Sequence, residues 1–235
     1  MLSTVNIYDI ASWCHISFRD NPLRYAHTLY LNGEEIKDLV IPEGVDCINS
    51  CAFKDFTELL SVSFPGNPIS IGSEAFMNCS NLTKIIIPGN IESVGYKAFQ
   101  DCSKLEYIIL GNGVGVVESL AFSNCPEISD VYSYSDIVIA NADAFEGSYP
   151  SYITLHVPEN AIDTYKELSP WNQFKEIVAL KDDDPNTTDI KSGIQNGASM
   201  QNHYYSIDGK LRYRPQRGIN IIRTNGGKMI KVFLK

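Results

Sequence analysis

Six cysteines and four histidines are the residues of this 235-residue chain with chemistry suited to metal binding, disulfide formation or nucleophilic catalysis. Cys79, Cys102 and Cys125 are 23 residues apart, so stacked coils would place them side by side. Packing of sulfur in an apolar interior explains this column better than metal binding. Cys47 and Cys51 are four residues apart, but no second pair or histidine cluster completes a zinc set. A disulfide between these two is an alternative if the protein is exported.

The histidines, at positions 15, 27, 156 and 203, are scattered along the chain. Cys14 and His15 are adjacent, but neighbours in sequence seldom point toward each other, and a nucleophile needs an oriented base within hydrogen-bond reach. The chain has no phosphate-binding loop, nucleotide-binding glycine fingerprint or zinc-protease motif. The sequence therefore predicts a protein without catalytic residues, bound metal or cofactor.

Charge is distributed unevenly along the chain. Residues 1–180 contain 9 Lys or Arg against 23 Asp or Glu, whereas residues 181–235 contain 10 against 5. The acidic body predicts no binding to nucleic acid, because phosphate contacts need positive charge. The basic tail either contacts an anionic partner or protects a sheet edge, and we favour the protected edge.

Nothing in the sequence resembles a membrane span or a leader. No apolar run approaches the roughly 18 residues that a membrane helix needs, and the first residues lack the basic and apolar regions of a signal peptide. Either the protein is cytosolic or the chain begins after a removed leader.

A repeat of 23 residues defines the elements that must position these side chains. An Ala-Phe pair recurs five times at this spacing, at Ala52-Phe53, Ala75-Phe76, Ala98-Phe99, Ala121-Phe122 and Ala144-Phe145. Two apolar columns keep the same step, namely Ile36, Leu59, Leu82, Leu105 and Ile128, and Leu39, Val62, Ile85, Ile108 and Val131. One coil cannot bury its own apolar face, so the coils are expected to stack and share a core.

One unit shows how a coil should fold. Leu82, Ile85 and Ile87 have the apolar spacing of a short strand, and Pro88 should end it because proline cannot donate to a ladder. The Ala-Phe pair then returns apolar groups to the interior. We expect a solenoid over residues 36–157, with Thr154 and His156 in register after one inserted residue.

Caps are expected at both ends of the solenoid. The N-terminal cap, 1–35, should hold a helix over 5–16 and a hairpin turning at Asn32-Gly33. The C-terminal cap, 158–180, should begin a short helix near Pro158. Trp171, Phe174 and Ile177 should cover the last coil. A polar linker, 181–203, and a small β meander, 204–235, should follow.

The unit from Ile85 to Cys102 resembles the BspA-type leucine-rich repeats found in surface proteins of gut and oral bacteria. The resemblance covers about residues 30–180 and implies an α/β-type solenoid with short parallel strands on a concave face. Ser133 and Ser148 depart from the repeat pattern, which suggests that the core thins or bends toward the C-terminal end. The tail resembles a short C-terminal domain of exported Bacteroidetes proteins, including sorting tails, and so implies contact with export or surface machinery.

The register also selects the strand residues that should face outward on the concave sheet. These are Lys84, Ile86, Tyr107, Ile109, Asp130, Tyr132, Tyr134 and His156. Tyrosines suit protein or sugar contacts, although β-branched and aromatic residues also favour strands for structural reasons. The leading hypothesis is an exported or cell-surface module that binds host protein or glycan through this face. The alternatives are an assembly protein acting through its solenoid ends or tail and, third, an enzyme.

Overall fold

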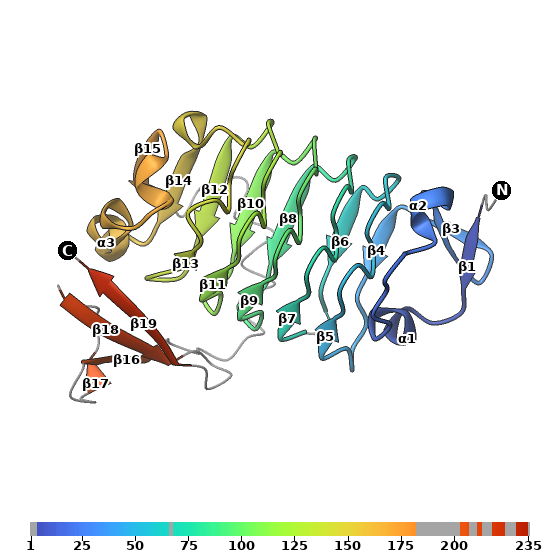
Figure 1. The fold of residues 1–235 in the computed structure, drawn as a ribbon, viewed down its shortest axis with the longest axis horizontal. Helices are drawn as coiled ribbons and strands as arrows, with labels where there is room; N and C mark the ends of the chain where they lie inside the picture. The colour runs from blue at the N-terminus through green and yellow to red at the C-terminus, as the bar shows by residue number, and fades with distance from the viewer. Residues whose placement is uncertain are drawn as a thin grey trace.

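The protein is a stack of coils that contributes strands to two parallel sheets (Figure 1). The computed structural model describes residues 4–65 and 68–181, together with the tail strands at 203–206, 211–212, 218–223 and 229–234. One five-stranded sheet contains β8 (Lys84–Ile87), β10 (Tyr107–Leu110), β12 (Asp130–Ser133), β14 (Thr154–Val157) and β15 (Glu176–Ala179). In the first coils, β4 (Asp38–Val40) and β6 (Ser61–Ser63) form a parallel pair. The expected leucine-rich-repeat solenoid is confirmed.

The second parallel sheet consists of two-residue strands. These are β5 (Cys47–Ile48), β7 (Ser70–Ile71), β9 (Ser93–Val94), β11 (Val116–Val117) and β13 (Ile139–Ala140). In both sheets, the 23-residue period is also the pairing register, so that Tyr107 lies opposite Lys84 on one side and Asp130 on the other. The step lengthens to 24 at the next strand, where Tyr132 pairs with His156. The expected single insertion is therefore confirmed.

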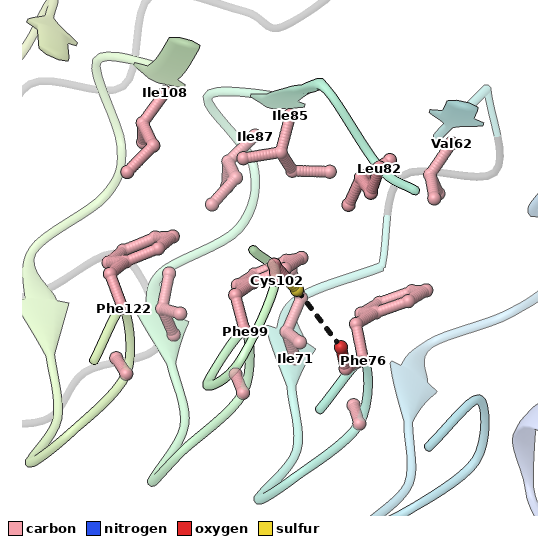
Figure 2. Close-up of a cluster of buried hydrophobic side chains, with 14 of the residues drawn as sticks. Val62, Ile71, Phe76, Leu82, Ile85, Ile87, Phe99, Cys102, Ile108 and Phe122 are labelled. Carbon is pink, nitrogen blue, oxygen red and sulfur yellow. Dashed lines mark hydrogen bonds between the residues drawn. The ribbon is translucent and has the colours of Figure 1, made fainter. Parts of the chain in front are cut away.

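The five phenylalanines of the Ala-Phe pairs form a continuous stack through the interior. Figure 2 shows Phe76, Phe99 and Phe122 from this stack. Successive ring centroids are 5.3 to 5.5 Å apart, with interplanar angles between 3° and 18°. The backbone N–H of each of the first four donates to the carbonyl of the alanine in the next coil, as Phe76 does to Ala98 at 2.8 Å. Each pair thus supplies a core ring and an inter-coil hydrogen bond.

The cysteine column is buried and also forms hydrogen bonds. The thiol of Cys102 donates to the carbonyl of Phe76 at 3.3 Å (Figure 2), and Cys79 and Cys125 do the same to earlier phenylalanines. Burial raises the pKa of Cys125 to about 12. Ser148 continues the column, because its hydroxyl donates to the Phe122 carbonyl at 2.6 Å. The serine therefore replaces the thiol without thinning the core, contrary to expectation.

Cys47 and Cys51 do not form the disulfide left open above. Both are free cysteines, and their thiols have different partners. Cys47 faces Asn49 Oδ1 at 3.4 Å, whereas Cys51 faces Glu74 Oε2 at 3.9 Å.

Two left-handed backbone positions flank the Ala-Phe pair in four of the five coils, and the last coil keeps the second of them. The column before the pair has φ between 56° and 60° at Cys51, Glu74, Lys97 and Leu120. The column after it has φ between 55° and 64° at Asp55, Asn78, Asp101 and Asn124, and Gly147 completes it. Asp and Asn tolerate this conformation better than other side chains. Their recurrence in the second column is therefore a sequence signal for a left-handed turn, separate from the apolar pattern.

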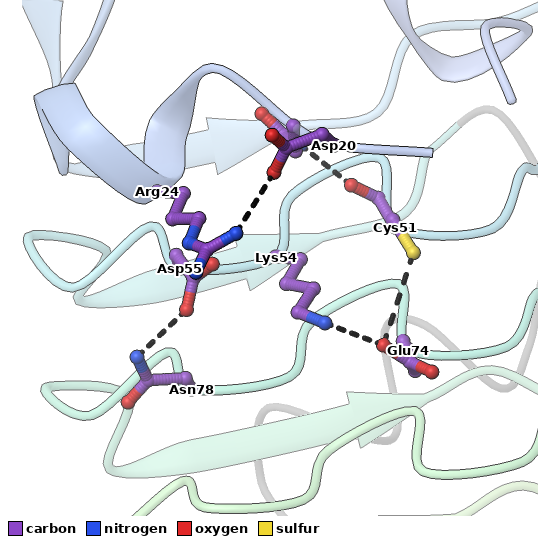
Figure 3. Close-up of polar contacts among 8 residues, drawn as sticks. Asp20, Arg24, Cys51, Lys54, Asp55, Glu74 and Asn78 are labelled. Atoms are coloured by element: carbon purple, nitrogen blue, oxygen red, sulfur yellow. Dashed lines mark hydrogen bonds and ion pairs between the residues drawn. The ribbon is translucent and has the colours of Figure 1, made fainter. Parts of the chain in front are cut away.

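Polar side chains at these turns connect neighbouring coils (Figure 3). Asn78 donates to Asp55 Oδ1 at 2.8 Å, and Asn124 donates to Asp101 in the same way. Lys54 pairs with Glu74 Oε2 at 2.6 Å. Burial is the largest single effect on Lys54 and opposes its charge, but the hydrogen bond to Glu74 and the charge of that carboxylate, with a smaller contribution from Asp55, together raise the pKa of the lysine.

The N-terminal cap differs from the expected helix. Residues Val5–Ile7 form strand β1, which pairs in parallel with β2 (Leu29–Leu31). Their alternating burial explains the strand, since apolar residues two apart face one side of a strand. Helix α1 (Ile10–Cys14) is shorter than expected and begins after Asp9, whose carboxylate accepts from the first turn. A second helix, α2 (Leu23–Ala26), was not anticipated. The hairpin between β2 and β3 (Glu34–Ile36) is present.

The C-terminal cap closes the core with aromatic side chains. Within 158–180 it comprises 3-10 turns at Glu159–Ala161 and Trp171–Gln173 and helix α3 (Ile162–Glu167). The 3-10 turn at Pro150–Tyr152 precedes these bounds but joins the cap, because the Lys175 N–H donates to the Pro150 carbonyl at 3.1 Å. Trp171 and Phe174 meet Phe145 edge-on, with centroids 5.5 and 5.2 Å away. The hydroxyl of Tyr165 lies 2.7 Å from Ser133 Oγ and donates to the Ser135 carbonyl.

This cap explains why a serine stands at position 133. Ser133 is fully buried, and its hydroxyl pairs with the capping tyrosine. The expected thinning of the core is therefore wrong here, because the departure from the repeat pattern provides a polar partner for the cap.

The tail forms a four-stranded antiparallel sheet. Its strands are β16 (His203–Ser206), β17 (Leu211–Arg212), β18 (Gly218–Arg223) and β19 (Met229–Leu234), in the order β17-β16-β18-β19. The expected meander is therefore wrong, because β16 rather than β17 pairs with β18. The two-residue β17 offers few ladder bonds and lies at the edge. The expected linker, 181–203, lies almost entirely outside the described residues.

Candidate functional site

The candidate site is the side of the β8–β15 sheet that faces away from the phenylalanine stack, here called the outer sheet face. It is formed by Lys84, Ile86, Tyr107, Ile109, Asp130, Tyr132, Tyr134 and His156, the eight residues selected from the sequence. In β8, the side chains of Ile85 and Ile87 are buried in the core, whereas Lys84 and Ile86 alternate with them and are only partly buried.

Strand pairing brings the selected residues into two adjacent rows. Lys84, Tyr107 and Asp130 are opposite one another in one row. The other row contains Ile86, Ile109, Tyr132 and His156, and Tyr134 directly follows β12. The constant register therefore brings side chains from four coils onto one continuous surface.

The exposure of this face differs from the expectation. Ile109 is completely buried and Tyr132 is 3% exposed. They form a second hydrophobic cluster, against which Ile86, Tyr107, Tyr134 and Leu180 pack. Apolar side chains on adjacent strands are close enough to pack laterally, so the two central residues are covered by their neighbours. The expectation that these two face solvent is wrong.

His156 is held by two partners within the site. Its Nε2 lies 2.9 Å from Asp130 Oδ1, with the side chains 15% and 26% exposed. Its ring stacks on Tyr132, with centroids 4.2 Å apart and an interplanar angle of 13°. These contacts fix the imidazole in one orientation at the edge of the hydrophobic cluster.

This geometry suits binding better than catalysis. The hydroxyl of Ser129 donates to Asp130 Oδ2 at 2.7 Å, so this neighbour bonds to the carboxylate rather than to the imidazole. A nucleophile activated by histidine must instead contact the base. The outer sheet face therefore combines a rigid apolar and aromatic floor with charged or polar groups at its border.

The contribution of β15 to this face was missed from the sequence. Val178 pairs with His156, and Leu180 follows the strand and packs against the second cluster. The 23-residue step could not reveal them, because the cap inserts turns and a helix before β15. The apolar run around Ile177 is the sequence signal for this strand, and its residues Glu176–Ala179 pair with β14.

Within the described part of the chain, no helix is both long and apolar enough to cross a bilayer. The expected contact between the tail and export machinery rests on side chains outside the described residues.

Comparison with known proteins places the repeat in a family. The model for the BspA type leucine rich repeat region matches residues 27–151 in six copies. No curated protein sequence matches the chain.

Two solved structures match part of the chain. A leucine rich cell surface protein from Faecalibacterium prausnitzii A2-165 is 24% identical over 73% of this chain, with a TM-score of 0.43. The pneumococcal vaccine antigen PcpA is 16% identical over 65% of the chain, with a TM-score of 0.48. The chain spans only 38% and 43% of these two proteins. Since the family match covers more than half of its residues, the chain belongs to the BspA-type leucine-rich-repeat family.

Proposed function

We propose that this protein is a non-catalytic binding module, located at the cell surface or secreted, that recognises a protein or glycan ligand through the outer sheet face. The observation that carries the proposal is the second hydrophobic cluster. Its apolar and tyrosine side chains gather on the side of the sheet opposite the main core. Contiguous apolar surface bordered by polar groups is typical of binding sites.

The burial pattern divides the proposed site into floor and contact residues. Ile109 and Tyr132 are buried and form the floor, whereas the partly buried Ile86, Tyr107 and Tyr134 remain accessible at their sides. Tyrosine provides a rigid apolar body and a polar hydroxyl, which suits both protein and sugar ligands. Lys84 and the Asp130–His156 pair supply charge and hydrogen bonds at the border. The surface or secreted location is proposed from the family, by analogy.

The experiment screens the purified full chain against panels of host matrix proteins and glycans, followed by variants of the proposed contacts. Tyr107→Ala should lower the affinity for the best ligand by about tenfold or more, because a central tyrosine is a typical hot spot. Tyr152→Ala is the matched control, since Tyr152 is 77% exposed in the C-terminal cap. Tyr132 is unsuitable for this test, because truncating a buried ring also lowers stability.

Equal affinity of the wild type and Tyr107→Ala for a ligand found in the screen would contradict the proposed site. Loss of affinity in both tyrosine variants would point to the cap instead.

Assembly through the solenoid ends is less well supported than binding. Each end is closed by a tryptophan whose indole N–H donates to a core carbonyl, Trp13 to Ala52 and Trp171 to Val138, both at 2.7 Å. A closed end offers no free coil to a partner. The tail is the second route, with a proposed role in export or attachment. Deletion of residues 203–235 should then abolish surface display without changing the unfolding of the repeat region.

A further inference from the structure

Three metal-ligating side chains meet where the N-terminal cap contacts the first coil. Among the residues that the structure describes, one group of this kind is found: His15 Nε2, a carboxylate oxygen of Asp46 and Cys47 Sγ, all within 4.8 Å of one another. His15 directly follows helix α1, whereas Asp46 and Cys47 lie at the start of β5. The group is distinct from the outer sheet face.

The backbone around this group is fixed by contacts between the cap and the coil. The N–H of Asn49 donates to the Cys14 carbonyl at 2.9 Å, and its side-chain amide donates to the His15 carbonyl at 2.6 Å. Both contacts lie within three residues of the three side chains. The backbone that carries the ligating groups is therefore held in place before any ion binds, and rotation of the side chains is left to bring their ligand atoms together.

The orientation of the His15 ring matches that of a metal ligand. Its Nδ1 lies 2.8 Å from the Ala11 carbonyl, and a carbonyl only accepts, so Nδ1 must carry hydrogen. In the neutral ring, Nε2 then presents a lone pair toward Asp46 Oδ1, 2.9 Å away. Two facing acceptors need a proton or a cation between them. Metal-bound histidines commonly donate their other ring N–H to a carbonyl in this way.

Imidazole, carboxylate and thiolate together suit a borderline-soft divalent ion. Zn²⁺ binds nitrogen at about 2.0 Å and sulfur at about 2.3 Å, which separates tetrahedral ligand atoms by about 3.3–3.6 Å. The atoms here, within 4.8 Å, need to approach by about 1 Å. Side-chain rotation can provide this, since His15 and Asp46 are 45% and 74% exposed. Cys47 would exchange its long contact with Asn49 and its hydrogen bond with Asp46 for the ion.

We propose that His15, Asp46 and Cys47 bind a divalent transition-metal ion of the zinc type, with water completing the coordination, and that the ion fastens the N-terminal cap to the first coil. Spacing along the sequence does not reveal this set, because Asp46 and Cys47 follow His15 by 31 and 32 positions. Docking of the cap on the first coil brings the three side chains together.

The test uses the full chain without a histidine tag, treated with chelator and kept reduced, and titrated with Co²⁺ and Zn²⁺. We expect one Co²⁺ site per chain with the near-ultraviolet charge-transfer band of a thiolate ligand, displaced by Zn²⁺. Cys47→Ser should abolish the band, and His15→Ala should weaken Zn²⁺ binding by about tenfold or more.

Cys51→Ser and His27→Asn are matched controls, because both residues lie close in sequence but outside the group. Both should bind as the wild type does. Circular dichroism of each variant confirms folding. Zn²⁺ at about 100 times its dissociation constant should also raise the Tm by roughly 5 °C.

Two results would overturn the proposal. The first is a Co²⁺ spectrum of Cys47→Ser that equals that of the wild type, or an unchanged Zn²⁺ affinity in His15→Ala. Either outcome would show that the group binds no metal and is a surface ion pair between His15 and Asp46. Binding at this site without a rise in Tm would refute the fastening role.

Discussion

At the residue scale, four successive coils place a small polar group in a column where the preceding coil has the apolar Phe56. The thiols of Cys79, Cys102 and Cys125 and the hydroxyl of Ser148 all donate to a phenylalanine carbonyl of the preceding coil. The column therefore contributes both volume and hydrogen bonds. Because these groups are buried, we expect them to react little with reagents in solution.

The reactivity of the thiols follows from this burial. Cys14, Cys79, Cys102 and Cys125 are completely buried, and burial raises the pKa of Cys14 and Cys125 to about 12. Since the thiolate is the nucleophile, these four should not react with an aromatic disulfide reagent at pH 8. They should also stay unreactive as the pH rises to 9. Cys51, which is partly exposed, should react in the native protein.

The measurement is a timed thiol titration of the metal-free protein with and without denaturant. Six equivalents should react after unfolding, and no more than two before it. A third fast thiol in the native protein would contradict the burial of the column.

A left-handed backbone position offers a stabilising substitution. Lys97 has φ of 56°, a conformation that costs a side chain with a Cβ about 1–2 kcal/mol. Glycine avoids this cost but loses about 0.5–1 kcal/mol in chain entropy. Lys97→Gly should therefore raise the free energy of unfolding by about 0.5 kcal/mol, measured by urea denaturation. Ser103→Gly, at an exposed position with ordinary φ, should lower it.

At the element scale, the phenylalanine stack links the coils into one cooperative unit. Phe99 contacts a ring on each side, at 5.3 Å in both directions. Phe99→Ala should lower the free energy of unfolding by about 3–5 kcal/mol, because it removes a fully buried ring and leaves a cavity. Tyr152→Ala, at an exposed position, should change it by less than about 0.5 kcal/mol. Equal unfolding midpoints for the two variants would show that the stack does not hold the coils together.

Elements inside the repeat could be predicted, whereas those outside it could be predicted only in part. Pro88 ends β8 and Asn32-Gly33 turns the hairpin, because local residues determine both features. Strand β1 was mistaken for helix, since its pairing with β2 depends on residues more than twenty positions away. The place of β17 at the edge of the tail sheet likewise depends on nonlocal pairing.

At the scale of the whole molecule, the distinction between features inside and outside the repeat also applies to the outer sheet face and the proposed metal site. The rows of the outer sheet face follow from the 23-residue step with one inserted residue before His156, so its members could be named from the sequence. The burial of the cluster of Ile109 and Tyr132 could not, because Leu180, one of the residues packed against it, follows the C-terminal cap and lies outside the repeat. The group of His15, Asp46 and Cys47 exists only where the cap meets the first coil. The repeat pattern therefore predicts the contacts between coils but not the contacts that the caps make.

The C-terminal cap should also control association of the whole molecule. Trp171 is fully buried, meets Phe145 edge-on at 5.5 Å and donates to the Val138 carbonyl. Trp171→Ala should expose the last ring of the stack and remove that hydrogen-bond donor. We expect a loss of about 3–5 kcal/mol in the free energy of unfolding, together with concentration-dependent association, because an uncapped coil presents an unsatisfied apolar face.

Sedimentation velocity across a range of protein concentrations measures this association, and urea denaturation measures the loss of stability. Gln173→Ala is the control, since Gln173 is exposed in the same 3-10 turn, and it should behave as the wild type. If Trp171→Ala is less stable but stays monomeric at every concentration, the tryptophan fills the core without shielding the end of the solenoid. Association of Trp171→Ala but not of Gln173→Ala would instead show that the cap prevents end-to-end stacking of solenoids. The lateral surface of the solenoid, which includes the outer sheet face, would then be the route to a partner.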